Sequence, residues 1–241
     1  MLAALEDGIG TTNACKHYDD ARHVPWDIKK YYHQRYSLFS RYDDGILMTD
    51  TAWFGVTPEP VANKVAQHLS EGAPASKAIL IDCFAGVGGN TIAFARSGRW
   101  KRVYAIEKDE NAILCGKHNA RLYGVDGLIS WFHGDCFEVM KNELEPLSQH
   151  SVVFASPPWG GPGYSTDPVF NLGSMDPYSL DELLDSFQQF TQEVVLFLPR
   201  TSDLRQLASA NHSLGRVKAI HYCMQGASKG ICAYFGLFAS P

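Results

Sequence analysis

The chain has 241 residues, of which 45% are hydrophobic and 12% aromatic, and its formal net charge is −5. That length and apolar content suit one large domain with room for a small appendage. An acidic chain is not expected to coat a long nucleic-acid duplex, because such proteins present a basic face. No apolar run reaches the roughly 20 residues that span a bilayer. Six scattered cysteines without a Cys-x-x-Cys pair argue against a disulfide framework or a structural zinc site. We therefore expect a soluble, intracellular protein without a metal.

The N-terminal part of the chain reads as an extension. Residues 1–25 are small and polar without the layout of a secretory signal, and we expect them to be flexible. Residues 26–72 predict a helical extension, two helices around DDGILMTDTAWFGVTPEP, packed over one edge of the next domain. From Lys16 to Arg41, six Lys or Arg alternate with six large aromatic residues. That pattern fits either a helix docking its aromatics on the core or a small platform for phosphates and a base.

Residues 73–241 predict an α/β domain, because β-rich runs alternate with helical stretches from residue 78 onward. The expected strands are 78–82, 102–107, 129–133, 151–156 and 194–198. The expected helices are 89–97, 109–123, 136–147, 179–190 and 202–210. The runs 215–224 and 230–238, joined by the turn-rich QGASKG, predict a hairpin at one edge. Repeated βαβ units indicate a mostly parallel sheet with helices on both faces. The whole pattern predicts a Rossmann-like, seven-stranded sheet of the class I methyltransferase type.

A glycine-rich turn follows the first expected strand in ILIDCFAGVGGNTIAFA. Gly86 and Gly88 allow the backbone to approach a ligand closely. Three acidic residues, Asp82, Glu107 and Asp135, end successive strands, where open α/β sheets bind ligands. Glu107 is placed to bind both ribose hydroxyls, Asp135 an adenine amino group, and Asp82 the amino-acid part of a cofactor. The pattern D-x-F-x-G-x-G-G therefore favours S-adenosylmethionine over NAD, whose pyrophosphate needs a different anchor.

The sequence SPPWGG comes directly after the fourth expected strand. Methyltransferases that modify an exocyclic amino group of a base carry an [NDS]-P-P-[YWF] turn at this place. The amine is a weak nucleophile because its lone pair is delocalised into the ring. The carbonyl oxygens of Ser156 and Pro157, held in place by the prolines, can accept hydrogen bonds from the N–H groups of this amine. Trp159 can stack on the base. Positioning and electrostatics then supply most of the catalysis.

Longer motifs resemble one family. SPPWGGPGY, DCFAGVGGNTIAFA, RYSLFSRYDDGI and WFGVTPEP together resemble the trimethylguanosine synthase family, over roughly residues 26–238. The resemblance implies two methyl transfers from S-adenosylmethionine to N2 of the 7-methylguanosine cap of small nuclear and nucleolar RNAs. It also implies nuclear or nucleolar location and delivery of the RNA by ribonucleoprotein partners. We expect a monomer that contacts no membrane.

The resemblance also assigns individual residues. Thr57 and Phe84 fall in segments that line the cofactor, and Trp159 is implied to stack on the methylated guanine. Asn119 falls near the guanine, and Phe39 and Phe197 are implied to complete its walls. Lys30 and Arg200 are implied to face the cap phosphates. Two departures are Glu107, where an aspartate is common, and Gly163, where the family has an acidic residue.

Two other functions remain open from the residues alone. An enzyme acting on cytosine N4 or adenine N6 of DNA also carries such a turn, but it usually has a target-recognition region and more positive charge. A non-catalytic cap-binding module would have no reason to keep Asp82, Glu107 and the glycines.

Overall fold

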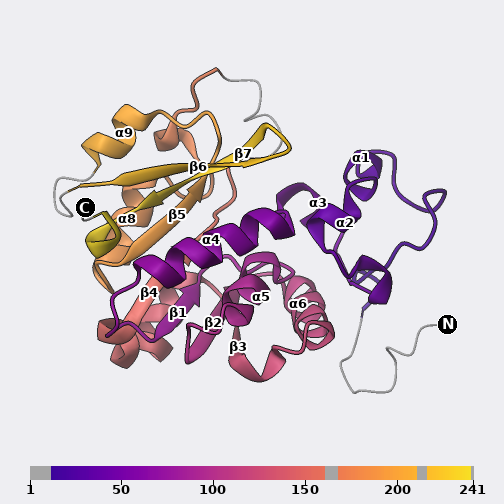
Figure 1. Cartoon of the computed structure of the whole chain (residues 1–241), viewed down its shortest axis with the longest axis horizontal. Helices are drawn as coiled ribbons and strands as arrows, with labels where there is room; N and C mark the ends of the chain where they lie inside the picture. The colour runs from indigo at the N-terminus through magenta and orange to yellow at the C-terminus, as the bar shows by residue number, and fades with distance from the viewer. Residues whose placement is uncertain (1–11, 161–167, 211–215, 240–241) are drawn as a thin grey trace.

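A seven-stranded sheet forms the centre of the computed structural model, which describes residues 12–160, 168–210 and 216–239 (Figure 1). The strands are β1 (Ile79–Asp82), β2 (Arg102–Glu107), β3 (Ile129–His133), β4 (Ser151–Ala155), β5 (Val194–Leu198), β6 (Lys218–Met224) and β7 (Ala227–Tyr234). Their spatial order is β3-β2-β1-β4-β5-β7-β6. The first five are parallel, and β7 is antiparallel to both β5 and β6. The predicted α/β class and edge hairpin are confirmed.

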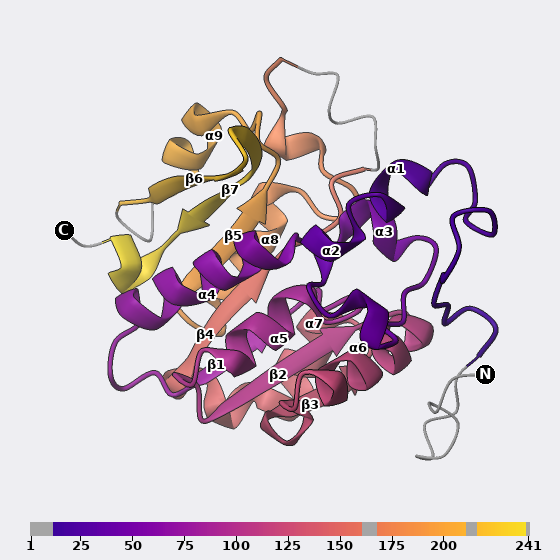
Figure 2. The same cartoon turned by 45° about the vertical axis from the view of Figure 1, so that its right-hand side comes forward.

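Helices cover both faces of the sheet. One layer contains α4 (Glu59–Gly72), α5 (Gly89–Arg96) and α6 (Glu110–Leu122), and the other contains α7 (Cys136–Val139), α8 (Leu180–Gln188) and α9 (Leu204–Ser209) (Figure 2). Successive side chains of a strand point to opposite faces. In β4, Val152 and Phe154 accordingly pack under the first layer, and Val153 and Ala155 under the second. Burial on both faces explains the continuous apolar run of this strand.

The turn of the edge hairpin is tighter than the sequence suggests. QGASKG was expected to be the connection, but the turn is only Gln225 and Gly226, with φ of +52° and +78°. Two successive residues with positive φ are typical of the two-residue turn that matches the twist of a hairpin. β7 therefore begins at Ala227, and a register shift at Tyr222/Cys223 accommodates the pairing.

The part of the extension before α4 consists of single-turn helices, where one longer helix was expected. These are α1 (Lys29–Tyr32), α2 (Arg35–Leu38) and α3 (Ala52–Gly55). Such short helices are not stable alone, and here a cluster of buried aromatic rings holds them. Tyr32 and Tyr42 lie 6.1 and 5.9 Å from Trp53, measured between ring centroids. The other expected helix, α4, packs on α5 and β6 and so belongs to the main helical layer.

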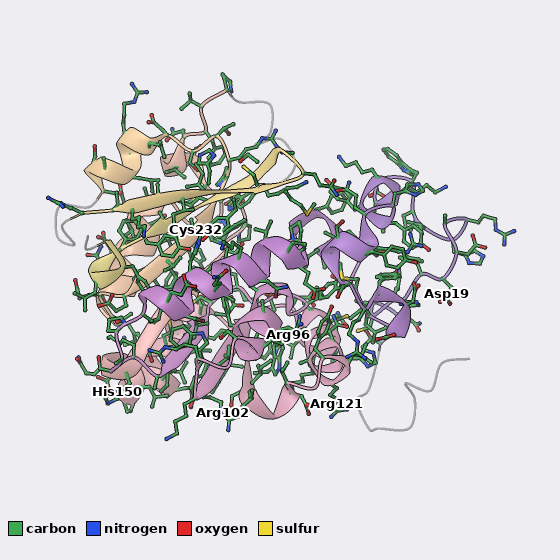
Figure 3. The ribbon with its side chains drawn as sticks, viewed as in Figure 1. Asp19, Arg96, Arg102, Arg121, His150 and Cys232 are labelled. Carbon is green, nitrogen blue, oxygen red and sulfur yellow. The ribbon has the colours of Figure 1, made fainter. Side chains whose placement is uncertain are left out.

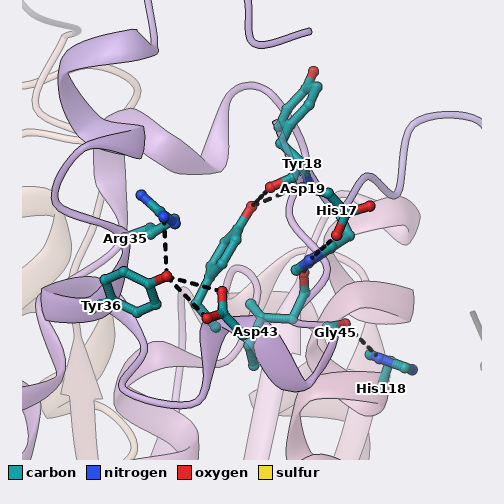
Figure 4. A network of polar contacts seen from close by, with 10 residues as sticks. His17, Tyr18, Asp19, Arg35, Tyr36, Asp43, Gly45 and His118 are labelled. Carbon is teal, nitrogen blue, oxygen red and sulfur yellow. Dashed lines mark hydrogen bonds and ion pairs between the residues drawn. The ribbon is translucent and has the colours of Figure 1, made fainter. Parts of the chain in front are cut away.

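Residues 1–25 were expected to be flexible, but several of residues 12–25, the part that the structure describes, pack against the extension. Tyr18 and Val24 are buried, and Lys16 pairs with Met48 in a β-bridge. The Tyr18 N–H donates to the Tyr42 hydroxyl at 3.2 Å, and His17 Nδ1 lies 2.9 Å from the carbonyl oxygen of Ile46 (Figure 4). Tyr18 and Val24 of this segment are part of the core.

One half-buried carboxylate joins the extension to the helical layer. Glu59, at the start of α4, accepts hydrogen bonds from Arg96 at 2.9 Å and from the Tyr123 hydroxyl at 2.8 Å. It also accepts the backbone N–H of Ser40. Arg96 lies below α4 in Figure 3. These contacts tie the extension, α4, α5 and the end of α6 together. Within the described ranges, no helix has both the length and the apolar character needed to cross a membrane.

Candidate active site at the carboxyl edge of the sheet

The glycine-rich turn connects β1 to α5, and its backbone needs glycine. Gly86 and Gly88 have φ of +53° and +93°, in the left-handed region that other residues rarely adopt. Gly89 is required for space instead, since a Cβ there would lie 2.9 Å from Val56 Cγ2. At Gly86 a Cβ would meet nothing within 4 Å, so this part of the turn has open space beside its backbone, and the close approach of a ligand stays a prediction.

Glu107, at the end of β2, is fixed by backbone amides. Its Oε2 accepts the N–H of Gly86 at 2.8 Å. Its Oε1 accepts the N–H groups of Lys108 and Asp109 at 2.8 and 3.0 Å. A carboxylate has about four acceptor positions, so this one retains capacity for a ligand hydroxyl. Glu107 thus joins the glycine-rich turn to the adjacent strand, where we predict the ribose.

Asp135 follows β3 and is the most heavily bonded of the three predicted acids. Its Oδ1 accepts two N–H groups at the start of α7, from Phe137 at 2.9 Å and from Glu138 at 3.3 Å. Its Oδ2 lies 2.6 Å from the Tyr178 hydroxyl and 2.7 Å from Lys108 Nζ. Burial raises the pKa of Asp135, but the contacts with Lys108 and Tyr178 outweigh it and hold the pKa at about 2.

Lys108 and Tyr178 were missed by the sequence reasoning. Lys108 Nζ donates to the Tyr178 hydroxyl at 2.9 Å, which closes a triad with Asp135. The Tyr178 ring packs edge-on against Phe137 at 5.0 Å and lies 6.4 Å from Phe84. Lys108 could have been found because it follows Glu107 directly. Tyr178 lies far along the chain and has no local signal. Phe84, predicted to line the cofactor, is half-buried beside this triad.

Asp82 ends β1 and is completely buried. Thr91 Oγ1 donates to its Oδ2 at 2.6 Å, whereas Oδ1 is buried without a hydrogen bond from the described residues. Burial raises the pKa of Asp82 to about 7, and the hydrogen bond from Thr91 acts in the opposite direction. A buried acceptor with an open position fits the ammonium of an amino-acid ligand. Contact with such a ligand also requires the surrounding side chains to move, because Asp82 has no exposed surface here.

Thr57 links the extension to the glycine-rich turn. Its side chain is buried, and its Oγ1 accepts a hydrogen bond from Asn90 Nδ2 at 3.0 Å. Asn90 lies in the first turn of α5, directly after the glycines. The structure therefore brings Thr57 next to the predicted cofactor segment, about 30 residues away in sequence.

The SPPW turn begins immediately after β4, and its tryptophan stacks on β5. The rings of Trp159 and Phe197 are nearly parallel, at 26°, with centroids 6.1 Å apart. Pro157 is buried, Ser156 and Trp159 are half-buried, and Pro158 is exposed. Behind Phe197 lies Gly230 of β7, where a Cβ would come within 2.6 Å of Phe197 Cζ. The missing side chain at Gly230 therefore leaves the space that Phe197 occupies beside Trp159.

Two predicted substrate residues have structural roles instead. Asn119 is fully buried, and its Oδ1 accepts the Leu47 N–H at 2.9 Å. Its Nδ2 donates to the carbonyls of Leu47 at 2.9 Å and Val87 at 3.0 Å. Both amide protons are engaged, so Asn119 clamps the extension to the glycine-rich turn rather than contacting guanine. Phe39 is also buried and packs 6.4 Å from Tyr123, on the side of α4 and α5.

The two residues predicted to face phosphates are both exposed. Lys30 is on α1, and Arg200 follows β5 by two residues. Their side chains are therefore accessible, and their approach to one ligand stays a prediction. Gly163 lies outside the described residues. No group of three or more metal-ligating side chains occurs in the part of the chain that the structure describes.

Comparisons with known proteins agree with this arrangement. Residues 77–238 match the family model described as RNA cap guanine-N2 methyltransferase. The chain is 36% identical to a trimethylguanosine synthase of Schizosaccharomyces pombe, over 89% of this chain and 88% of that protein. It is also 36% identical to a trimethylguanosine synthase of Saccharomyces cerevisiae, over 86% of this chain and 67% of that protein.

A solved structure supports the fold. The human methyltransferase 10 domain containing protein superposes with a TM-score of 0.60 and 12% identity, over 89% of this chain and 99% of that one. At such low identity the likeness concerns architecture alone. The family match and the two relatives cover the stretch of sequence that forms the methyltransferase-type sheet. The same stretch contains the glycine-rich turn and the SPPW turn at one edge of that sheet. The chain belongs to the RNA cap guanine-N2 methyltransferase family.

Proposed function

We propose that this protein transfers methyl groups from S-adenosylmethionine to N2 of a 7-methylguanosine cap, giving 2,2,7-trimethylguanosine. The single observation that carries the proposal is the SPPW turn directly after β4, with Trp159 stacked on Phe197. This flat aromatic surface lies at the same sheet edge as the glycine-rich turn and Glu107. A base on one side and a methyl donor on the other can therefore meet.

The residues fit S-adenosylmethionine on three points. The glycine-rich turn has open space at Gly86, Glu107 retains acceptor capacity, and Asp82 Oδ1 is a buried acceptor with an open position. When bound, S-adenosylmethionine supplies an electrophilic methyl group on a sulfonium. Glu107 then orients the ribose, and Asp82 faces the ammonium. The tyrosine and lysine around Asp135 fix that carboxylate beside the adenine.

The chain's own residues position the attacking amine. The carbonyl oxygens of Ser156 and Pro157 accept hydrogen bonds from the two N–H groups of N2. These hydrogen bonds favour a more tetrahedral nitrogen. Bound S-adenosylmethionine would supply the methyl group, and Ser156, Pro157 and Trp159 would hold N2 in line with it. N2 then loses a proton to water, so no strong general base is needed. Most of the rate gain comes from orientation within this site.

A 7-methylguanine is favoured over an ordinary base. N7 methylation makes the ring cationic, and a cation over an indole face gains roughly 1–2 kcal/mol when water is excluded. Trp159 supplies that face. Lys30 and Arg200 are exposed and carry the charge that cap phosphates require.

The direct test offers labelled S-adenosylmethionine with four acceptors in parallel: m7GDP, m7GpppG, GpppG and duplex DNA. We expect label on the two m7G compounds alone, and mass spectrometry should show up to two added methyl groups. Label on DNA would favour an amino-methyltransferase of DNA. Binding of m7GDP without any transfer would favour a non-catalytic cap-binding module.

We infer further that the natural substrates are small nuclear and nucleolar RNAs, delivered by ribonucleoprotein partners in the nucleus or nucleolus. These assignments are supported by the resemblance alone. Immunoprecipitation of trimethylguanosine-capped RNA from cells lacking the protein tests the RNA substrates. Imaging of a tagged protein tests the nuclear or nucleolar location. We also propose a monomer, which light scattering checks.

A further inference from the structure

An exposed group of aromatic and basic side chains lies on the extension, and of its members only Lys30 was assigned a role above. We call it the α1 patch, and its members are Trp26, Lys29, Lys30, Tyr31 and Phe54. Trp26 is 87% exposed, more than any other large hydrophobic side chain in the described residues, and Phe54 is 42% exposed. Tyr31 joins them, since its ring meets that of Phe54 edge-on at 5.3 Å. A single exposed apolar residue is ordinary, but aromatics grouped with cations suggest a binding surface.

The lysines of the α1 patch differ from the other cations of the extension. Those cations are engaged: Lys16 pairs with Asp50, Arg22 with Asp20, Arg41 with Asp44, and Arg35 stacks on Tyr32 and Tyr36. Arg35 Nη2 also donates a hydrogen bond to the Tyr36 hydroxyl at 3.0 Å, as Figure 4 shows. Lys29 and Lys30 are exposed and make no ion pair with any described residue, and Lys30 Nζ lies 4.7 Å from the Tyr31 ring.

The α1 patch is connected to the catalytic edge by a short path. α1 contacts α3 through Tyr31 and Phe54, and α3 ends two residues before Thr57. Thr57 in turn bonds Asn90 at the start of α5. The same helix, α1, carries Lys30, to which the proposed function assigns cap phosphates. The rest of α1 therefore lies beside the residue that is proposed to bind the cap phosphates.

We propose that the α1 patch binds the RNA that follows the cap, with a base stacked on Trp26 and a downstream phosphate paired with Lys29. The proposal rests on the proposed function for its substrate class. Stacking suits any sequence because every base has an aromatic face, and lysine contacts with phosphate are equally indifferent to sequence. The patch therefore selects capped single-stranded RNA over a free cap nucleotide.

The test compares a cap nucleotide with capped RNA. Dissociation constants are measured for m7GDP and for a capped five-nucleotide RNA, using wild type, Trp26→Ala, Lys29→Ala and Leu237→Ala. Leu237 is a matched control, since it is 58% exposed and lies near the opposite end of the chain. We expect wild type to bind the capped RNA about tenfold more tightly than m7GDP. Trp26→Ala should remove most of that difference and leave m7GDP unchanged.

Lys29→Ala should weaken the binding of the capped RNA several-fold and reduce the salt dependence of that binding. If Trp26→Ala loses affinity equally for m7GDP and for the capped RNA, or if neither affinity changes, the proposal is overturned. The same loss in Leu237→Ala also overturns it.

Failure of the proposed function is separable from failure of this proposal. An uncapped, 5′-phosphorylated RNA of the same sequence is titrated against wild type and Trp26→Ala, following tryptophan emission. This needs no methyl transfer. Quenching in wild type that is lost in Trp26→Ala supports the patch even if no cap is methylated. Absence of quenching in wild type contradicts it even if the cap is methylated.

Discussion

The two halves of the sheet's carboxyl edge hold their site residues by different forces. On the half formed by β1, β2 and β3, Glu107 and Asp135 together accept five backbone N–H groups, and Asp135 also contacts Lys108 and Tyr178. On the half formed by β4 and β5, Trp159 stacks on Phe197, which in turn depends on the space at Gly230. We predict that the hydrogen-bonded half fixes the polar cofactor and that the flat apolar half holds the base. The following predictions test this division.

The largest effect is expected on the apolar half. Trp159→Ala should lower kcat/KM for m7GpppG by about 100-fold or more, because misplacing the base by about 1 Å already costs that much. S-adenosylhomocysteine should bind as in wild type, since the hydrogen-bonded half is untouched. Trp159→Phe is the matched control and should keep part of the activity. Full turnover of Trp159→Ala with an unchanged circular-dichroism spectrum would show that the indole is merely structural.

On the hydrogen-bonded half, Glu107→Ala should raise the dissociation constant of S-adenosylhomocysteine about 10- to 100-fold. A hydrogen bond to a charged group contributes about 1.5–3 kcal/mol, and the N–H groups of Gly86, Lys108 and Asp109 also lose their acceptor. Calorimetric titration measures this, with Glu107→Gln as an isosteric control. An analogue that lacks the ribose 2′-hydroxyl should bind wild type more weakly than S-adenosylhomocysteine does. Glu107→Ala should bind the two ligands equally well. If the analogue loses the same affinity in both proteins, Glu107 does not contact the ribose.

Gly230→Ala tests the packing behind the stacked rings. Its Cβ would meet Phe197 Cζ at 2.6 Å and displace that ring toward Trp159. We expect a roughly fivefold rise in KM for m7GpppG and a loss of about 1–2 kcal/mol in stability, typical of overpacking. Cofactor binding should stay normal. Gly127→Ala is the control, because a Cβ there meets nothing within 4 Å. Unchanged kinetics in Gly230→Ala would show that the Phe197 ring can move without consequence.

The smallest effect is expected at the triad. Tyr178→Phe keeps the ring against Phe137 but removes the hydroxyl that donates to Asp135. Because Lys108 still contacts that carboxylate, the dissociation constant of S-adenosylhomocysteine should rise only about threefold. KM for the cap should not change. Tyr104→Phe, at a half-buried tyrosine in the middle of β2, serves as control. A tighter cofactor complex in Tyr178→Phe would mean that the hydroxyl competes with adenine for Asp135.

Local patterns in the sequence determined the sheet, the glycine-rich turn and the SPPW turn. Alternating strands and helices, positive-φ glycines and prolines after an apolar run are all properties of neighbouring residues. The sequence therefore placed Gly86, Glu107 and Trp159 at strand ends, where the structure has them. Local patterns also suggested the basic and aromatic stretch of the extension, without separating its buried aromatics from its exposed ones.

Only the tertiary structure decided which of these side chains are free to act. Asn119 looked like a ligand of guanine, but its amide lies fully buried between Leu47 and Val87, which are distant in sequence. Tyr178 reaches Asp135 across 43 residues, and Phe197 finds its space at Gly230 on another strand. Trp26 and Tyr32 are both aromatic residues of the extension, yet one is 87% exposed and the other 3%. Burial and hydrogen-bond partners arise from contacts between distant segments, so no local pattern could report them.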